Sequence, residues 1–326
     1  MSESARPLIA LSRQVPEPLL AQLRPHGTVR MPDTPVADDL ATLFRDADYA
    51  LVTAGDRVDR PLLAACPRLR LVSTVSAGFD HIDIDACTAR GVRVCNTPQA
   101  VAAATADLAF GLLLAAARRI VEADAFVRAG RWRPGSAPLF GMDVHHQHLG
   151  IVGLGRIGME LAKRARGFDM VVSYHNRRRL AAHEEARLGV RYLDFDELLE
   201  QSDAILVQAP YSAATHHLIG AAQLARMKPT AVLVNCARGG VVDDAALAAA
   251  LGEGRLAAAG LDVTEGEPSV HPALRRLPNV VLSPHNGAST RGTHARMTLE
   301  AFDNLIGALR GDTLCNCVNP ARPDTA

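Results

Sequence analysis

Short apolar runs alternate with Ala- and Leu-rich stretches along nearly the whole chain of 326 residues. Short apolar runs between turn residues are typical of buried strands, and the longer stretches are typical of helices. Alternating strands and helices form βαβ units that feed a parallel sheet, so the pattern predicts an α/β fold. The candidate strands are residues 8–11, 49–53, 71–75 and 93–95, followed by residues 149–152, 170–174, 204–208, 231–235, 258–262 and 280–283.

Two breaks in this pattern divide the chain into two domains. Asn96-Thr97-Pro98 interrupts the first series of strands, and residues 101–119 are predicted to form a long, mostly buried helix because small and apolar residues surround it. A final helix over residues 291–310 follows Gly287 and can return to pack on the first domain. A chain of this length usually exceeds one core, so we expect one domain of residues 1–98 plus 289–326, and a second of residues 99–288.

Charge and cysteine content exclude several classes of function. Basic and acidic residues balance at 35 each and the pI is near 7.2, so no overall field directs the chain to nucleic acid or anionic lipid. The longest apolar run, residues 108–117, is too short to span a bilayer, and the first residues do not read as a signal peptide.

The six cysteines lack CxxC spacing, which favours free thiols in a cytoplasmic compartment: Cys66, Cys87, Cys95, Cys236, Cys315 and Cys317.

The strongest motif is a glycine-rich turn between a candidate strand and a candidate helix. Residues 149–158 read LGIVGLGRIG, with Gly153, Gly155 and Gly158 in GxGxxG spacing. The first glycine permits a tight turn, the second lets the backbone approach a pyrophosphate, and the third lets the helix pack closely. The helix N-terminus, where Arg156 and Ile157 lie, attracts the anion. The motif therefore predicts a dinucleotide-binding domain.

The end of the next candidate strand indicates which dinucleotide is bound. An acidic residue usually lies about 20 positions past the first glycine, where it holds the ribose hydroxyls of NAD. Here that position is Asn176, followed by Arg177, Arg178 and Arg179. Guanidinium groups can pair with a 2′-phosphate, which a carboxylate would repel, so NADPH is the expected cofactor. The alternative is that the arginines form an ordinary solvated face.

Three later strand ends carry the residues of a candidate catalytic site. In open α/β sheets, ligands bind beyond the carboxyl ends of the strands. Arg238 follows strand 231–235, Glu267 follows strand 258–262, and His285 follows strand 280–283. Taken one at a time, each residue also has a purely structural interpretation. Arg238 could form an ion pair at the strand end, Glu267 could cap a turn before Pro268, and the hydrogen bonds of His285 could be satisfied within its loop.

These three residue types suit the reduction of a 2-oxo acid. Hydride addition leaves an alkoxide that needs a proton, and histidine is the side chain that ionises nearest to neutrality, so His285 is the expected acid. Glu267 would orient the ring and favour its charged form. Arg238 would pair with the substrate carboxylate and polarise the carbonyl.

Two other polar features are given structural roles. Residues 145–148 read HHQH, but adjacent histidines seldom converge on one ion without a carboxylate or cysteine partner, so no metal is expected. Cys236 neighbours Arg238, and a small buried role is favoured over a reactive thiol.

These segments together resemble the D-isomer-specific 2-hydroxyacid dehydrogenases over nearly the full chain. Residues 76–80, SAGFD, look like the loop whose backbone N–H groups hold the substrate carboxylate, which implies substrate contacts at Ala77, Gly78 and Arg238. The resemblance implies two Rossmann-like domains with parallel sheets, an active site in the cleft between them, and a homodimer formed through the cofactor domain. The cofactor contacts expected from the motif and the resemblance are Thr105, Gly153, Gly155, Arg156, Ile157, Gly158, Asn176, Arg177, Arg178, Ala209, Pro210, Thr215, Cys236, Ala237, Asp262, His285 and Gly287.

Within that family, two further segments look like the bacterial glyoxylate/hydroxypyruvate reductases that also reduce 2-ketogluconate. These are residues 140–146, FGMDVHH, and residues 316–320, NCVNP. Those enzymes use NADPH, in agreement with the arginines. Asn286-Gly287 after the histidine departs from the family pattern, where an apolar residue precedes the glycine.

The leading hypothesis is therefore an NADPH-dependent reductase of a small 2-oxo acid such as glyoxylate, hydroxypyruvate or 2-ketogluconate, forming the D-2-hydroxy acid. One alternative is an NAD-dependent dehydrogenase of the 3-phosphoglycerate type, against which the missing ribose carboxylate argues. Another is a non-catalytic dinucleotide sensor, since the family resembles the C-terminal-binding-protein corepressors. The complete set of Arg238, Glu267 and His285 argues against that sensor, and turnover would discriminate the two.

Overall fold

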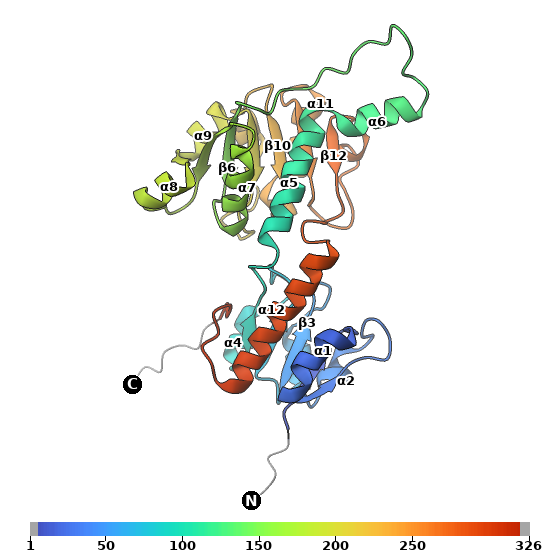
Figure 1. Ribbon diagram of the computed structural model, residues 1–326, viewed down its shortest axis with the longest axis vertical. Helices are drawn as coiled ribbons and strands as arrows, with labels where there is room; N and C mark the ends of the chain where they lie inside the picture. Colours follow the sequence, from blue (N-terminus) through green and yellow to red (C-terminus); the bar gives the residue numbers. More distant parts are fainter. Residues whose placement is uncertain (1–5, 320–326) are drawn as a thin grey trace, which may run out of the picture. The chain divides into compact units, whose positions relative to one another are not determined.

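The computed structural model describes residues 6–319, which form two compact units. One unit combines the two ends of the chain, Met1–Val101 with Ser289–Ala326, and the other is the continuous segment Ala102–Ala288. Figure 1 shows a separate sheet with its own helices in each unit, and α5 begins the second unit. We refer to them below as the terminal unit and the central unit.

The terminal unit is built on a five-stranded sheet in which all pairs are parallel. Its strand order is β2-β1-β3-β4-β5, the doubly wound order found in flavodoxin-like folds. The strands are β1 (Leu8–Leu11), β2 (Thr28–Arg30), β3 (Tyr49–Val52), β4 (Leu71–Thr74) and β5 (Arg93–Cys95). The helices are α1 (Glu17–Leu23), α2 (Leu40–Phe44), α3 (Arg60–Ala65), α4 (Ile84–Ala89) and α12 (Arg291–Arg310).

Helix α12 brings the end of the chain back onto this first sheet, as the sequence predicted. The hydroxyl of Ser73 in β4 donates to the carbonyl oxygen of Ala301 in α12 at 3.0 Å. The side-chain amide of Asn304, also in α12, donates to the carbonyl oxygen of Asn96 at 3.0 Å. Both bonds are buried, so they add to the packing that holds the helix on this unit.

The central unit contains a seven-stranded parallel sheet in the order β12-β11-β10-β9-β6-β7-β8. Strand order reverses between β6 and β9, the topological switch point at which Rossmann folds bind dinucleotides. The strands are β6 (His148–Val152), β7 (Val171–His175), β8 (Arg191–Tyr192), β9 (Ala204–Val207), β10 (Val232–Asn235), β11 (Ala258–Leu261) and β12 (Val280–Leu282).

Helices of the central unit cover this sheet, and α5 packs against β10 and β11 (Figure 1). A Cβ added to Gly260 in β11 would lie 3.0 Å from Cβ of Leu112, so the helix approaches the strand too closely for a larger residue. The helices are α5 (Ala102–Ala117), α6 (Ile120–Arg128), α7 (Arg156–Arg166), α8 (Ala182–Leu188), α9 (Phe195–Gln201), α10 (Ala221–Leu224) and α11 (Asp244–Gly252).

The observed elements confirm the predicted α/β class and all ten predicted strands, with ends that shift by at most one residue. The predicted helices at residues 101–119 and 291–310 correspond to α5 and α12. Two strands were not predicted, β2 and β8, which have three and two residues. Both lie at a sheet edge and are only partly buried, so neither leaves a continuous apolar run in the sequence.

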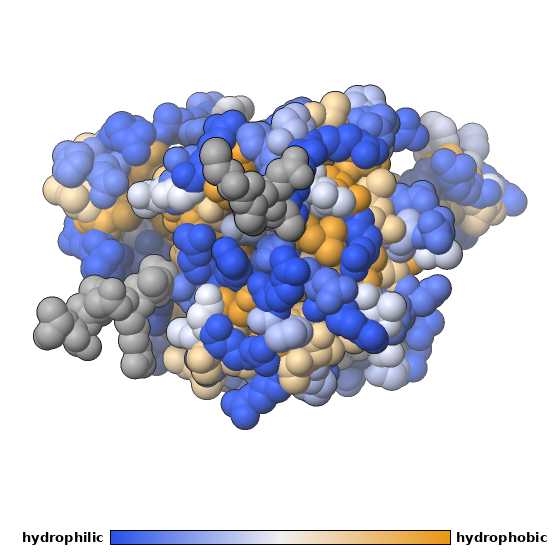
Figure 2. Space-filling model, turned by 90° about the horizontal axis from the view of Figure 1, so that it is seen from below, coloured by the Kyte–Doolittle hydropathy of each residue, from blue (hydrophilic) through white to orange (hydrophobic). Residues whose placement is uncertain are grey.

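The surface carries a mixture of residue types. Figure 2 shows one face on which hydrophilic residues predominate and hydrophobic residues form separate patches among them. Among residues 6–319, every helix is too short or too polar to cross a membrane.

Candidate active site

The glycine-rich turn lies directly after β6, at the switch point of the central sheet. Gly153 adopts a positive φ of 101°, a conformation that L side chains rarely adopt. A Cβ at this position would also lie 2.8 Å from the backbone nitrogen of Ala209, in the segment after β9. The turn and the segment after the neighbouring strand are therefore in backbone contact, which only glycine allows.

The other two glycines of the motif lie where a dinucleotide requires them. A Cβ at Gly158 would lie 2.7 Å from the carbonyl oxygen of Gly153, so helix α7 can close on the turn only without a side chain. Gly155 has open space beside it and precedes the first residue of α7, an eleven-residue helix. The open side of Gly155 and the N-terminus of α7 fit a pyrophosphate, since a helix N-terminus presents N–H groups to an anion.

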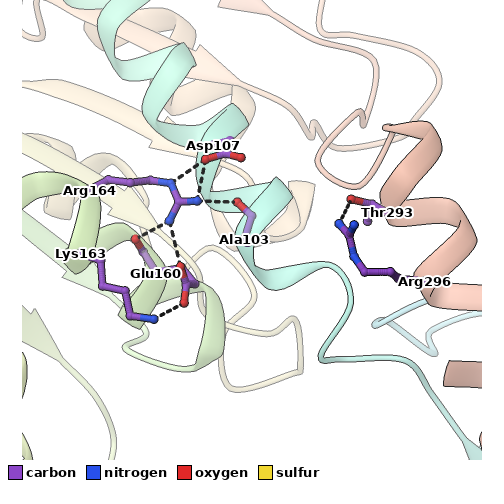
Figure 3. Close-up of polar contacts among 7 residues, drawn as sticks. All are labelled: Ala103, Asp107, Glu160, Lys163, Arg164, Thr293 and Arg296. Atoms are coloured by element: carbon purple, nitrogen blue, oxygen red, sulfur yellow. Dashed lines mark hydrogen bonds and ion pairs between the residues drawn. The ribbon is translucent and has the colours of Figure 1, made fainter.

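Ion pairs fix α7 against α5, which carries the predicted cofactor contact Thr105. The guanidinium of Arg164 in α7 donates to Asp107 Oδ1 at 2.6 and 2.8 Å and to the carbonyl oxygen of Ala103 at 3.0 Å, as Figure 3 shows. The same guanidinium donates to Glu160, one turn earlier in α7. Arg164 is only partly exposed and bonds to both helices at once, so these contacts hold α7, whose N-terminus faces the turn, against α5.

The segment after β7 has one residue bound to the glycine-rich turn and two that face solvent. Asn176 Oδ1 accepts a hydrogen bond from the Leu154 N–H at 2.7 Å, so the residue in the usual acid position supports the turn. Arg177 and Arg178 are exposed, and neither guanidinium has a protein partner in the described part of the chain.

Arg179 differs from its two neighbours. Its guanidinium makes two hydrogen bonds of 2.8 Å to the carboxylate of Glu185, and it lies over the ring of Tyr192. Glu185 also accepts from the Tyr174 hydroxyl at 2.8 Å. These hydrogen bonds, that of Arg179 first, lower the pKa of Glu185 to about 2. Of the three consecutive arginines, Arg179 therefore anchors the loop to α8.

His285 and Glu267 meet beyond the carboxyl ends of β12 and β11. The ring Nδ1 of His285 lies 2.8 Å from Glu267 Oε2, and the other carboxylate oxygen accepts from the backbone N–H of Thr264 at 3.2 Å. Glu267 is therefore held at one oxygen by the backbone and holds the imidazole with the other. Both side chains are partly exposed and line a pocket of about 280 Å³ together with Val270 and Leu282.

Buried Asp262, at the end of β11, holds the loop that carries His285. Its Oδ1 accepts from the Ser283 hydroxyl at 2.5 Å and from the Asn286 N–H at 2.7 Å, and its Oδ2 accepts from the Gly287 N–H at 2.8 Å. His285 itself has a positive φ of 54°, a conformation that histidine tolerates better than most residues do. The carboxylate of Asp262 thus fixes the residues on both sides of the imidazole.

Asp262 also explains the position of Gly287, another predicted cofactor contact. A Cβ at Gly287 would lie 3.1 Å from Thr105 Cγ2 and 3.3 Å from Asp262 Oδ2. The loop after His285 and the first turn of α5 therefore lie against each other within the central unit. Thr105, Asp262 and Gly287, which are far apart in the sequence, belong to one local cluster.

Arg238 lies in a tight turn after β10 that packs against the Glu267 segment. Asn235 braces this turn, because its side-chain amide donates to the carbonyl oxygen of Arg238 at 2.9 Å. A Cβ at Gly239 would lie 2.0 Å from the carbonyl oxygen of Thr264, so the backbone of the turn is in direct contact with the segment that Glu267 supports. Through Gly239, Thr264 and Glu267, a continuous series of contacts joins the turn of Arg238 to His285.

The remaining predicted cofactor residues lie after β9, after β10 and at the start of α7. The Thr215 hydroxyl donates to the carbonyl oxygen of Pro210 at 2.7 Å and accepts from the Ser212 N–H, which makes this loop compact. Cys236 and Ala237 are buried, and burial raises the pKa of the Cys236 thiol, as expected for a packing role. Arg156 and Ile157 are the first two residues of α7.

The predicted substrate loop belongs to the terminal unit and follows β4. The side-chain amide of Asn96 donates to the carbonyl oxygen of Ala77 at 2.7 Å, and the Thr97 N–H donates to that of Ser76 at 2.9 Å. Gly78 is next to this anchored residue and is partly exposed. The segment after β5 therefore braces the loop that follows β4.

Sequence reasoning did not single out a cluster of His216, His217 and Glu265 in the central unit, where Glu265 lies two residues before Glu267. One potential ligand atom from each lies within 4.8 Å of the others, a spacing that a metal ion could use. Within the cluster, His217 Nε2 lies 2.6 Å from Glu265 Oε1, and this hydrogen bond raises the pKa of His217. By contrast, His148 of the HHQH segment has both ring nitrogens in contact with Gln201 and Ser173.

The switch-point turn and the polar strand ends define the class of protein: the chain belongs to the D-isomer-specific 2-hydroxyacid dehydrogenases. The family's NAD-binding domain matches residues 110–287. The protein is therefore an oxidoreductase that uses a nicotinamide dinucleotide.

Particular relatives are similar along almost the whole chain. Glyoxylate/hydroxypyruvate reductase B of Salmonella typhimurium is 47% identical over 325 residues, covering 97% of this chain and 98% of the relative. An NADPH-dependent glyoxylate/hydroxypyruvate reductase from Sinorhizobium meliloti, solved with NADP and malonate, has a TM-score of 0.85 and 32% identity, covering 99% of this chain and 100% of that one. A 2-hydroxyacid dehydrogenase from Ketogulonicigenium vulgare has a TM-score of 0.84 and 33% identity, covering 98% and 100%.

Proposed function

We propose that the protein is an NADPH-dependent reductase of small 2-oxo acids, with His285 as the proton donor. The observation that carries this proposal is the 2.8 Å contact between His285 Nδ1 and Glu267, in the unit that contains the glycine-rich turn. The names of the relatives favour glyoxylate and hydroxypyruvate as substrates, and 2-ketogluconate is a further candidate.

In this mechanism Gly155 and the N-terminus of α7 would hold a nicotinamide dinucleotide, which when bound would supply the hydride needed to reduce the carbonyl group. Glu267 accepts a hydrogen bond from Nδ1 of His285, which leaves Nε2 to donate its proton to the substrate oxygen as negative charge develops there. The carboxylate also fixes the orientation of the ring. Asp262 keeps the ring in place because its carboxylate binds the Ser283 hydroxyl on one side of His285 and the Asn286 N–H on the other.

Arg238 supplies a permanent positive charge that a histidine cannot. Its turn is braced by Asn235 and by the close approach of Gly239 to Thr264, so little reorganisation is needed on binding. We assign the guanidinium to the substrate carboxylate and to the carbonyl oxygen. We also assign the backbone N–H groups at Ala77 and Gly78 to substrate binding, which makes the terminal unit the substrate-binding domain and the central unit the cofactor domain.

The loop after β7 supports a preference for NADPH. Asn176 replaces the carboxylate that would repel a 2′-phosphate, and its side chain is already bound to Leu154. Arg177 and Arg178 are exposed and have no competing carboxylate in the described part of the chain. Two guanidinium groups beside the ribose position can pair with the phosphate at no cost to an existing ion pair.

Replacing Arg177 and Arg178 with Ala should raise the KM for NADPH by about 10²-fold while changing the KM for NADH less than threefold, since charge-assisted hydrogen bonds contribute about 1.5–3 kcal/mol. Steady-state assays with each cofactor measure both values. The double variant Arg275→Ala/Arg276→Ala is the matched control, because it removes two adjacent exposed arginines of the same unit elsewhere. Equal effects on the two cofactors would contradict phosphate recognition.

A spectrophotometric panel tests the proposed function most directly. Glyoxylate, hydroxypyruvate, 2-ketogluconate and 3-phosphohydroxypyruvate are each assayed with NADPH and with NADH. The proposal expects turnover of at least one of the first three acids, with NADPH preferred. Preference for the phosphorylated acid with NADH would favour the 3-phosphoglycerate type, and dinucleotide binding without turnover of any acid would favour a sensor.

We also propose that the protein forms a homodimer through α6 and the segment that follows it, residues 120–143. Figure 1 shows this segment extending from the rest of the central unit. Large apolar side chains on it are exposed, with Trp132 at 72% and Phe140 at 80%, and Val121 and Val127 are also exposed. Such a set is typical of a surface that another chain covers.

If this segment forms the dimer, Val127→Asp should convert the protein to a monomer, because an unpaired carboxylate buried in an apolar interface costs several kcal/mol. Sedimentation at micromolar protein concentration measures the mass. Val36→Asp, which places the same charge on an exposed valine of the terminal unit, should leave the mass unchanged. A dimer that persists in Val127→Asp would exclude this surface.

A further inference from the structure

Two cysteines from opposite ends of the chain face each other in the terminal unit. Cys95 is the last residue of β5 and is fully buried, whereas Cys317 lies in the segment after α12 and is partly exposed. An isolated antiparallel bridge pairs the two residues. Neither residue has a role in the proposed reduction, and both are free thiols in the structure.

The hydrogen bonds around the bridge define its geometry. The Asn96 N–H donates to the carbonyl oxygen of Asn316 at 3.2 Å, and the Val318 N–H donates to that of Val94 at 2.9 Å. The bonds therefore lie on either side of Cys95 and Cys317, which makes them a non-hydrogen-bonded antiparallel pair. In such pairs the Cα atoms are about 4.5 Å apart and the side chains approach most closely. This separation falls within the range of roughly 4.4–6.8 Å over which a disulfide forms.

The two thiols differ in a way that suits stepwise oxidation. Contact with the Cys95 thiol lowers the pKa of Cys317, while the same contact and burial raise the pKa of Cys95. Cys317 is partly exposed whereas Cys95 is fully buried, so Cys317 is the partner that an oxidant can reach and the one on which a thiolate is favoured. Reactive cysteines are typically partly exposed and of low pKa, with a second thiol close by.

We propose that Cys95 and Cys317 are a redox pair that a hydroperoxide converts to a disulfide, which covalently attaches the C-terminal segment to β5. The Cys317 thiolate attacks a peroxide oxygen: the S–O bond forms, the O–O bond breaks, and the departing alkoxide takes a proton to become an alcohol. Cys95 then attacks the sulfur of the sulfenic acid, the S–S bond forms, and hydroxide leaves with the Cys95 proton as water. The two sulfurs lose two electrons in total, and the peroxide gains them.

The attachment lies one residue from the brace of the predicted substrate loop. Asn96 follows Cys95 and donates to the carbonyl oxygen of Ala77, while its own carbonyl oxygen accepts from Asn304 of α12. On the other side, the amide of Asn316 donates to Glu300 and Asn304 in α12. The disulfide would therefore lock together β5, α12 and the terminal segment. The relevance of this link to substrate binding rests on the proposed function, whereas the formation of the disulfide does not.

Peptide mapping after treatment with hydrogen peroxide tests the proposal on the full-length protein. Trypsin cleaves after Arg93 and Arg310, so the expected product is residues 94–118 linked to residues 311–326, and dithiothreitol should separate them. Cys315 lies on the same peptide as Cys317, so variants are needed to assign the bond. The linked product should persist in Cys315→Ser, the matched control, and disappear in Cys317→Ser and in Cys95→Ala.

Thermal unfolding gives a second readout that does not depend on activity. Oxidation should raise the Tm of the wild type and of Cys315→Ser by about 5 °C or more, since the disulfide closes a long loop, and should not raise that of Cys317→Ser. Cys317→Ser removes a partly exposed sulfur, so it is expected to fold even if a change at buried Cys95 does not. Linkage through Cys315, a link between two chains, oxidation of Cys317 to sulfinic acid without a link, or a lower Tm on oxidation would each overturn the proposal.

Discussion

Replacing His285 with Gln is expected to lower kcat by about 10²–10⁴-fold, the usual contribution of a positioned general acid. Glutamine can still accept or donate a hydrogen bond at this position, but it cannot deliver a proton to an alkoxide. The affinity for NADPH should change little, because the glycine-rich turn and α7 are held by Gly153, Gly158 and Arg164. Stopped-flow reduction and fluorescence titration of NADPH separate these two quantities.

The backbone at His285 makes a second variant necessary. Its φ of 54° favours Asn over Gln, since asparagine is among the residues that adopt this conformation most readily. His285→Asn should therefore fold and show the same loss of kcat. His183→Gln, at an exposed histidine in α8 of the same unit, should retain full activity. Parallel loss of NADPH binding and kcat in both His285 variants would indicate a structural role instead.

Arg238→Ala should lower kcat/KM by about 10²–10³-fold, or about 2.7–4 kcal/mol of transition-state stabilisation, comparable with the loss of an oxyanion donor. The side chain is partly buried and its turn is rigid, so few other groups can take its place. The loss should appear in both kcat and KM, since the guanidinium is assigned to the carboxylate as well as to the carbonyl oxygen. Steady-state kinetics with glyoxylate give both constants.

Arg238→Lys distinguishes charge from shape. Lysine keeps the positive charge but lacks the planar fork that can bind a carboxylate with two parallel hydrogen bonds. We expect it to recover only part of the activity lost in Arg238→Ala. Arg255→Ala, at an exposed arginine paired with Glu253, is the matched control for loss of an arginine in this unit. A loss of tenfold or less in Arg238→Ala would remove Arg238 from the mechanism.

The sequence predicted most of the fold because its strands are buried on both faces. Strands such as β3, β9 and β11 are entirely buried, and they leave continuous apolar runs that are easy to recognise. The glycines of the motif were also informative. Gly153 and Gly158 lie so close to other backbone atoms that no side chain fits at either position. Edge strands β2 and β8 have no such signal.

Side-chain interactions between residues that only the fold brings together could not be predicted from the residue types alone. Three consecutive arginines look equivalent in the sequence, and only the fold brings Glu185 and Tyr192 to Arg179. The pairing of Cys95 with Cys317 spans most of the chain and has no local pattern. By contrast, the contact between Glu267 and His285 was anticipated, because the carboxyl ends of neighbouring parallel strands lie at one edge of the sheet.

The loop after β7 is fastened at both ends, by Asn176 on the glycine-rich turn and by Arg179 on Glu185. Only two side chains, those of Arg177 and Arg178, lie between these anchors, and neither contributes to the packing of the unit. Substitutions at these two positions are therefore expected to change the free energy of unfolding little. If Arg177 and Arg178 select the phosphorylated dinucleotide, as we propose, cofactor preference is an evolutionarily independent trait, which can drift or switch while the catalytic chemistry stays the same.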